Sequence, residues 1–391
     1  MAEVFDVVIA GGAAMGSSLA YHLAADAGFK GRVLVVEKDP TYAKAATSLS
    51  LSSIRQQFSS ALNIRVGLAG VAFLKSARET LAVEGDAPDL PLTEHGYLYL
   101  ATEGGAEALR ANHATQIAEG ADVALLAPDD VTARYPYLSV EGVALASLGL
   151  SGEGWFDAYS LMQALRRKAI SLGAVYRKNE VVDLMRAGSR VEAVRLASGE
   201  TVGCGAFVNC AGASGAADLA RRLGAPIPVE ARKRCVFVFE AKRFEKFPLL
   251  IDPSGVYVRP EGRHYLVGGP PPKPDPDCQD FEVVWDQFED VLWPALAARV
   301  PAFEELKRGR AWAGHYDLNT FDHNALVGRT PGFDNAYLAA GFSGHGAQQA
   351  PAVGRGLAEL IAHGRYRTLD LSDFAVERVA QGRPILERNI I

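Results

Sequence analysis

The first forty residues alternate between apolar runs and a segment with helical spacing. Residues 5–10 (FDVVIA) form an apolar, β-branched run typical of a buried parallel strand, and residues 32–37 (RVLVVE) form a second one. Between them, GGAAMG (11–16) precedes a segment whose apolar positions recur with helical spacing and which ends at Gly28. The pattern predicts a strand, a glycine turn, a helix and a second strand that ends in Glu37.

This order of elements is typical of a dinucleotide-binding unit. The helix start offers free N–H groups and a partial positive charge to a pyrophosphate, glycines let the backbone approach it, and the acid accepts from ribose hydroxyls. Ala13 stands where the fingerprint has its middle glycine, and we expect Gly12 to keep the turn competent for binding. The turn does not distinguish NAD from FAD. The expected contacts are Gly11, Ala13, Ala14, Met15, Gly16, Glu37 and Lys38.

Later segments are also rich in small residues, and they lie far apart in the chain. They are residues 45–59 (AATSLSLSSIRQQFS), 205–215 (GAFVNCAGASG) and 339–354 (AAGFSGHGAQQAPAVG). Together they predict one long ligand lying across the fold, which favours FAD over a loosely bound nicotinamide. A helix follows the last glycine turn, and we expect it to begin just before Pro351, because proline is tolerated in a first turn.

Alternating and amphipathic patterns fill the remainder. Residues 96–101 (GYLYLA) and 229–269 contain alternating, aromatic-rich runs that predict the strands of a second domain. Residues 157–174 have an amphipathic helical pattern with a glycine near the end, and they return the chain to the first domain. Trp155, Phe156, Tyr97 and Tyr99 are either core residues or part of a cavity wall.

Composition narrows the class of protein. The chain has 391 residues, which is enough for two domains, with 49% hydrophobic and 22% charged residues, as in a globular protein with a large core. Its net charge of −6 argues against a nucleic-acid partner, and no apolar run reaches the ~18 residues of a membrane span. The N-terminus shows no basic segment or cleavage site, so we expect a cytoplasmic protein. The four cysteines lack metal-ligand spacing, so no metal site is expected.

Several motifs, taken together, resemble one family. GGAAMG with Glu37, VNCAGAS (208–214), WAGHYDLNTFDHNALVG (312–328) and GFSGHG (341–346) resemble the D-amino-acid oxidase/sarcosine oxidase group of FAD-dependent amine oxidoreductases. SIRQQFS (53–59), NTFDHN and GFSGHGAQQAP look closest to its sarcosine-dehydrogenase-like branch, which includes the mitochondrial FAD-dependent oxidoreductase-domain proteins.

The resemblance covers nearly the whole chain and implies an α/β fold. A Rossmann-type FAD-binding domain of the glutathione-reductase-like kind would comprise residues 1–90, 150–220 and 312–391. It would be interleaved with an α+β substrate domain, residues 91–149 and 221–311, built on an antiparallel or mixed sheet.

The resemblance also implies cofactor contacts by position. Thr47, Ser48 and Ser50 would follow the pyrophosphate and ribityl chain, and Ala211 and Gly212 the pyrophosphate. The backbone of Val181 would meet adenine, although its side chain alone indicates plain core. Backbone N–H groups at a helix start would stabilise negative charge on the reduced flavin, from Gly344, His345, Gly346, Ala347 and Gln348. His345 either acts beside the flavin or only caps the turn.

Part of this family attaches its flavin to a cysteine, and that position is Gly314 here. Other members use a histidine in the loop after the second strand, but residues 41–59 contain none. His315 adjoins Gly314 and is the remaining nucleophile at this place. We predict a non-covalent FAD.

The family chemistry requires a carbon–hydrogen bond next to a neutral amine, held against the flavin, with a cation for the substrate carboxylate. Arg55 and Arg259 are the candidate cations, and Tyr257 is expected to border the cavity. His264 and His315 are further polar candidates. Monomeric sarcosine oxidases hold the substrate carboxylate with an arginine and a lysine. By motif position, Phe58 and Gln348 stand in their places here. Leu266 stands in the place of the lysine that those enzymes use in oxygen activation.

Neither sarcosine as substrate nor oxygen as acceptor can therefore be carried over. We expect oxidation of a secondary amine or N-substituted amino acid, sarcosine- or iminodiacetate-like, with reoxidation by oxygen. The alternatives are a dehydrogenase that passes electrons to a quinone or flavoprotein, an assembly factor of a respiratory complex, and, less compatible with the later segments, an NAD-dependent dehydrogenase.

Overall fold

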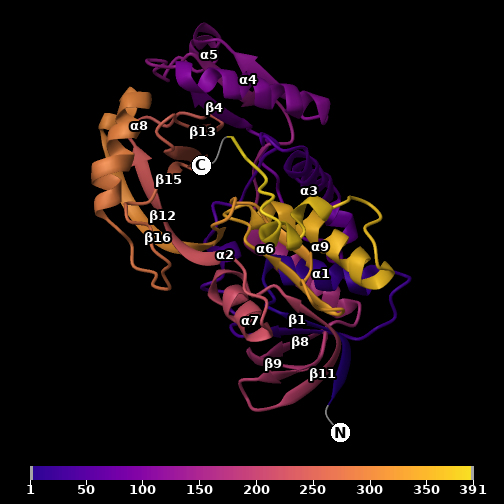
Figure 1. Cartoon of the computed structure of the whole chain (residues 1–391). Helices are drawn as coiled ribbons and strands as arrows, with labels where there is room; N and C mark the ends of the chain where they lie inside the picture. The colour runs from indigo at the N-terminus through magenta and orange to yellow at the C-terminus, as the bar shows by residue number, and fades with distance from the viewer. Residues whose placement is uncertain (1–2, 389–391) are drawn as a thin grey trace.

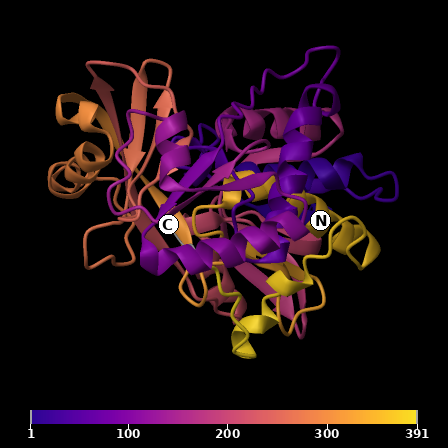
Figure 2. The same cartoon turned by 90° about the horizontal axis from the view of Figure 1, so that it is seen from above.

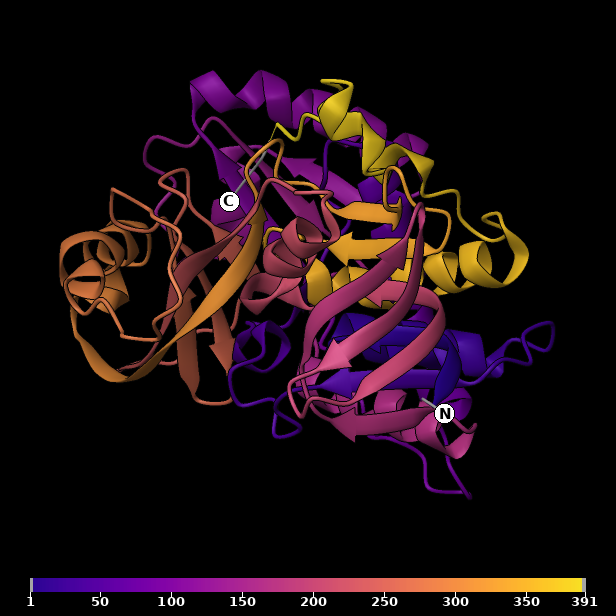
Figure 3. The same cartoon turned by 60° about the horizontal axis from the view of Figure 1, so that its bottom comes forward.

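A computed structural model describes residues 3–388 (Figure 1). One β-sheet contains strands from both the first and the last part of the chain. The central strand β1 pairs in parallel with β2 and β11, and β18 extends the sheet next to β11. Figure 3 shows the indigo N-terminal strands in the same sheet as magenta and orange strands from later in the chain. The strand order is β17 (Leu326–Arg329), β18 (Ala336–Ala340), β11 (Thr201–Asn209), β1 (Val4–Ala10), β2 (Val33–Glu37) and β8 (Val175–Lys178), with β10 (Arg190–Leu196) and β9 (Val181–Ala187) joined through β11.

Helices cover this first sheet. Helix α1 (Ala14–Ala25) packs against α9 (Gly346–His363) and α6 (Ala158–Ser171), and α3 (Ala61–Thr80) packs against α9. Leu19, Leu23, Val353 and Leu357 are fully buried in the core that results. Helix α7 (Ala216–Leu223) contacts β9. The apolar runs at residues 5–10 and 32–37 are buried because parallel strands with helices on their faces exclude water from both sides.

A second, mostly antiparallel sheet carries its own core. Phe237, Phe239 and Tyr265 are fully buried there. In Figure 2 helix α8 (Trp293–Arg299), in orange, lies at the outer end of this sheet. The strand order is β16 (Leu306–Asn319), β12 (Val229–Ala241), β15 (His264–Gly268), β14 (Tyr257–Glu261), β13 (Leu249–Ile251), β4 (Tyr97–Ala101), β6 (Leu145–Gly149) and β5 (Val123–Leu126), with α4 (Glu103–Ala118) and α5 (Pro128–Arg134) beside it.

The remaining elements are short. They are α2 (Ala46–Leu49), β3 (Ser53–Ile54), which pairs with β7 (Gly154–Trp155), the 3₁₀ helices η1 (Gly212–Ser214), η3 (Pro301–Glu304) and η4 (Ser372–Phe374), the π-helix η2 (Phe288–Leu292), and α10 (Glu377–Ala380). Within residues 3–388 no helix combines the length and the apolar character that crossing a membrane requires.

The predicted α/β fold with an antiparallel or mixed second sheet is confirmed, and the expected start of the last helix is wrong. Residues 312–319, expected in the first domain, are part of β16, which pairs with β12 from Asn319 back to Leu306. The division into domains stays a prediction. Helix α9 begins at Gly346 and contains Pro351 in its interior. Its first turns are buried against α1 and α3, and this packing outweighs the hydrogen bond that the proline ring removes.

Candidate functional site

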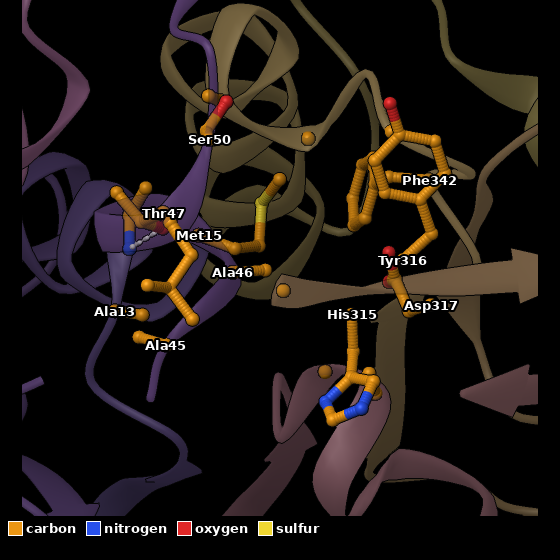
Figure 4. A pocket seen from close by; sticks show the side chains of 18 of the residues that line it. Ala13, Met15, Ala45, Ala46, Thr47, Ser50, His315, Tyr316, Asp317 and Phe342 are labelled. Atoms are coloured by element: carbon orange, nitrogen blue, oxygen red, sulfur yellow. Dashed lines mark hydrogen bonds between the residues drawn. The ribbon is translucent and has the colours of Figure 1, made fainter. Parts of the chain in front are cut away.

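A cavity of 390 Å³ lies where the two sheets meet. Figure 4 shows side chains from the first glycine turn, the segment around Thr47, the end of β16 and the loop at Phe342 arranged around it. The structure therefore brings the widely spaced small-residue segments together. The sequence-derived candidates that line the cavity are Gly11, Ala13, Ala14, Met15, Glu37, Lys38, Thr47, Ser50, Arg55, Ala211, Gly212, Tyr257, Gly314, His315, Gly344, His345, Gly346 and Ala347.

The glycine turn is built for close backbone approach. Gly11 has φ +94°, and a Cβ there would lie 2.4 Å from the carbonyl oxygen of Cys210, in the turn after β11. Helix α1 has no acidic residue in its first turn, and its positive end faces the cavity. Gly16 lies outside the cavity lining. Position 16 requires glycine because a Cβ there would lie 1.9 Å from the Gly11 carbonyl oxygen.

The acid at the end of β2 is held in place. One Glu37 oxygen accepts the Gly12 N–H at 2.7 Å and the other accepts the Asp39 N–H at 2.8 Å. Each oxygen keeps a further lone pair that can accept from a ribose hydroxyl. Lys38 is exposed and lies 3.8 Å from the Glu180 carboxylate.

The hydroxyl residues after β2 differ in position. The Thr47 hydroxyl lies 3.4 Å from the Ala14 N–H at the start of α1, so it borders the place expected for the pyrophosphate. The Ser50 hydroxyl accepts the Ser52 N–H at 2.9 Å. Ser48 lies outside the lining, and its buried hydroxyl has no hydrogen-bond partner among the described residues. Val181 also lies outside it, in the core at the start of β9, as its side chain alone indicated.

The glycine turn before α9 brings backbone N–H groups to the cavity. Gly344 has φ +96°, and a Cβ there would lie 2.6 Å from the Tyr316 ring. Helix α9 follows at Gly346 without an acidic residue in its first turn. The backbone of residues 344–347 therefore presents a second positive helix end to the cavity.

Arg55 is a buried cation that faces the cavity. It is 6% exposed, and its guanidinium carbon lies 4.7 Å from the Phe58 ring centroid, with Tyr97 and Tyr99 also within 6 Å. Among residues 3–388 no carboxylate lies within ion-pair distance of it, and its Nε has no hydrogen-bond partner. A buried guanidinium without an anion is costly unless a ligand supplies one.

His345 and Gln348 hold this arginine. Arg55 Nη2 donates to His345 Nε2 at 3.1 Å, so the imidazole carries its proton on Nδ1, and Gln348 Oε1 accepts the Arg55 backbone N–H at 2.8 Å. Burial, and secondarily the charge of Arg55, lower the pKa of His345 to about 3. The histidine is therefore neutral at physiological pH and acts on Arg55 rather than as an acid. Gln348 itself lies outside the lining.

Arg259 is placed differently from the other candidate cation. It lies outside the cavity lining, pairs with Glu261, donates to the Leu51 carbonyl at 3.0 Å, and lies over the Trp155 ring at 5.0 Å. Its charge is thus engaged within the protein. His264 is likewise removed from the cavity and lies 3.0 Å from the Glu240 carboxylate.

Tyr257 lies in the cavity wall beside Tyr316. Burial and the proximity of Tyr316 raise the pKa of Tyr257 well above its usual range, so the phenol keeps its proton. The cavity residues that went unnoticed in the sequence include Arg234, which pairs with Asp275, and Tyr316 and Asp317, which follow His315 on β16. The only sequence signal of Tyr316 and Asp317 was their place beside Gly314.

Glu153 is a buried carboxyl group that sequence reasoning also missed. It accepts the backbone N–H groups of Gln56 at 2.6 Å and Gln57 at 3.1 Å. It thereby fixes the chain just after Arg55. Burial raises the pKa of Glu153 to about 7, with the hydrogen bonds to Gln57 and Gln56 acting in the opposite direction.

The cavity wall around Gly314 leaves little space for a covalent anchor. A Cβ at Gly314 would lie 2.9 Å from the Leu49 Cβ. His315 Nε2 donates to the Asp280 carbonyl at 2.7 Å, and the ring packs edge-on against Phe281. The described residues contain no group of histidine, cysteine and acidic side chains that could hold a metal ion.

We expect acid denaturation to release all of the bound flavin into the supernatant, because the position that holds a cysteine in part of the family is Gly314 here and a side chain there would meet Leu49. The measurement is the absorbance of supernatant and pellet after precipitation in trichloroacetic acid. Flavin absorbance that stays with the pellet would contradict the prediction, and replacing His315 with asparagine would then identify the anchor.

Comparison with known proteins agrees with this geometry. Residues 6–360 match the family described as "FAD dependent oxidoreductase". The chain is 42% identical to FAD-dependent oxidoreductase domain-containing protein 1 of Xenopus laevis, over 100% of this chain and 85% of that protein. Its fold is similar to that of L-proline dehydrogenase from P. horikoshii, with TM-score 0.87, 26% identity, and coverage of 98% and 100%. It is also similar to glycine oxidase from Geobacillus kaustophilus, with TM-score 0.82, 25% identity, and coverage of 96% and 99%.

Proposed function

This chain belongs to the family of FAD-dependent oxidoreductases, and on that premise we propose that it oxidises a secondary amine or N-substituted amino acid that carries a carboxylate. FAD is the cofactor, and members of the family act on amino acids or amines. The observation that carries the proposal is Arg55, a buried guanidinium that faces the cavity and forms no ion pair with any of residues 3–388.

The residues of the cavity fit FAD. Gly11 and the start of α1 would hold the pyrophosphate, Glu37 the ribose, and the backbone of residues 344–347 the ring system. When bound, FAD supplies an acceptor for the hydride from the carbon next to the substrate nitrogen, and water hydrolyses the resulting imine. No covalent link is proposed.

Arg55 would bind the substrate carboxylate. A guanidinium offers two parallel N–H donors to a carboxylate, and the surrounding rings of Phe58, Tyr97 and Tyr99 exclude water from the pair. His345 and Gln348 fix the side chain and backbone of Arg55, so the substrate is oriented before reaction. Phe58 and Gln348 stand at the positions of the two sarcosine oxidase cations. Here they would instead support Arg55, by ring packing and by a hydrogen bond to its backbone.

Neither His345 nor Tyr257, which both line the cavity, can act as a strong base there. The lone pair of His345 Nε2 already accepts from Arg55, and the phenol of Tyr257 keeps its proton. The amine would therefore bind uncharged, with the Tyr257 hydroxyl as a hydrogen-bond partner. Val236, Leu249 and Ile251 line the wall formed by the second sheet, which suits an apolar substituent on nitrogen.

We propose oxygen as the electron acceptor of the reduced flavin. The residue at the position of the oxygen-associated lysine favours a different acceptor. Leu266, at the position of the oxygen-associated lysine, packs with Val236 and Val238 and brings no charge to this wall. A dehydrogenase that reduces a quinone or a flavoprotein is the second candidate. Formation of hydrogen peroxide during turnover in air would support the first, and bleaching in air with slow recovery the second.

An anaerobic panel of amines tests the proposed substrate class. We expect N-alkylglycines and proline to bleach the flavin absorbance faster than glycine does, because the apolar wall binds the substituent, and amines without a carboxylate to bleach it least. Iminodiacetate and D-amino acids complete the panel. If no carboxylate-bearing amine bleaches a flavin that dithionite reduces normally, the proposal is wrong.

A further inference from the structure

Asp317 is a carboxyl group of the cavity wall that the proposed reaction does not use. It lies near the end of β16 and accepts the Gly341 N–H at 2.8 Å and the Phe342 N–H through its carboxyl group. Its backbone carbonyl accepts the Ser343 N–H at 3.1 Å. One residue thus holds three successive N–H groups of the loop that leads to Gly344 and α9. In Figure 4 Asp317 lies beside Tyr316, close to Phe342.

The surroundings of Asp317 leave its charge uncompensated. Within residues 3–388 no lysine, arginine or histidine forms an ion pair with it. Ala231 lies directly opposite on β12, while Glu230 and Arg232, on the other face of that strand, pair with each other. Two further cations of β12 are also paired, Lys233 with Asp280 and the cavity-lining Arg234 with Asp275. His345, the titratable side chain of the loop, is neutral, and η1 contributes the uncharged Ser214 to the wall. Burial raises the pKa of Asp317 to about 6, partly offset by the N–H groups of Phe342 and Gly341.

We propose that Asp317 is a positioning residue for the flavin: it fixes loop 341–347 and places a titratable carboxyl group beside the bound ring system. The inference rests on the proposed location of the flavin at this loop. The reduced form of a ligand that gains negative charge on reduction is destabilised beside a carboxylate, whereas a neutral carboxylic acid has no such effect. The protonation of Asp317 should therefore make the flavin easier to reduce.

Replacing Asp317 with asparagine separates the charge from the shape. We expect the reduction potential of the bound flavin to be the same in wild type and Asp317→Asn at pH 5, where both side chains are neutral. At pH 8 the variant should have the more positive potential, because only the wild type carries the charge. The measurement is a dye-equilibrated reductive titration at several pH values. Identical potentials from pH 5 to 8 would overturn the proposal.

Glu359→Gln is the matched control. Glu359 is a buried carboxylate that accepts two backbone N–H groups, from Arg367 at 2.7 Å and Thr368 at 2.9 Å, and it lies outside the cavity lining. Its variant should follow the wild-type potential at every pH. A shift equal to that of Asp317→Asn would show a general effect of removing buried charge and would also overturn the proposal.

Asp317→Ala tests the hold on the loop. Removing both acceptor oxygens should weaken FAD binding about tenfold, as expected when one or two hydrogen bonds are lost from a binding loop. Fluorescence titration of the apoprotein measures the affinity, and unchanged affinity would overturn the positioning role. If this variant does not fold, the asparagine result decides alone. Neither measurement uses an amine, so failure of the amine panel leaves both tests intact.

Discussion

Replacing Arg55 with alanine is expected to raise the apparent Michaelis constant for a carboxylate-bearing amine by about 100-fold or more, the loss typical when one partner of a buried charge pair is removed. FAD should stay bound, because the expected cofactor contacts come mainly from backbone groups. Steady-state kinetics on the best amine of the panel measure the effect. Arg55→Lys should recover only part of it, since an ammonium lacks the planar pair of donors.

Arg259→Ala is the matched control for this prediction. Both arginines are buried, and both lie over aromatic rings, but only Arg55 lines the cavity. Arg259→Ala should reduce stability, because it leaves Glu261 and the Leu51 carbonyl without their partner, and should change the Michaelis constant far less. If the two variants have the same kinetics, Arg55 is not the carboxylate anchor.

The sequence was most informative where a backbone requirement forces a residue type. Gly11 and Gly344 both have left-handed φ angles and both lie in the cavity lining. Because such φ angles favour glycine, both turns are marked in the sequence by their glycines. The order of strand, turn, helix and Glu37 constrained the first sheet in the same way. These features are local, and local spacing is what a sequence displays directly.

The remainder depended on contacts between distant segments. Nothing local showed that residues 312–319 pair with β12, or that packing on α1 and α3 would carry α9 past Pro351. Asp317 became visible only when β16 was placed against loop 341–343, and the choice between Arg55 and Arg259 required the cavity itself. Side-chain roles set by tertiary contacts were thus beyond pattern analysis.

Replacing Gly11 with alanine, which adds a single methyl group, is expected to weaken FAD binding strongly. In Gly11→Ala the new methyl carbon would lie 2.4 Å from the Cys210 carbonyl oxygen, and the residue would keep φ +94°. A backbone oxygen that directly follows a paired strand cannot move as a side chain can, so the turn at Gly11 must shift, and with it the N–H groups expected to bind the pyrophosphate. We expect FAD affinity to fall by about 100-fold or more, which is the loss of about 3 kcal/mol.

Gly332→Ala separates this effect from backbone strain alone. Gly332 also has a left-handed φ, +81°, but a Cβ there would meet no atom within 4 Å, and the residue lies outside the cavity lining. This variant should lose about 1 kcal/mol of unfolding free energy and keep its FAD affinity. Fluorescence titration with FAD, together with circular dichroism of each apoprotein, distinguishes a displaced turn from an unfolded chain. Equal FAD affinity in the two folded variants would mean that the turn after β1 does not carry the pyrophosphate.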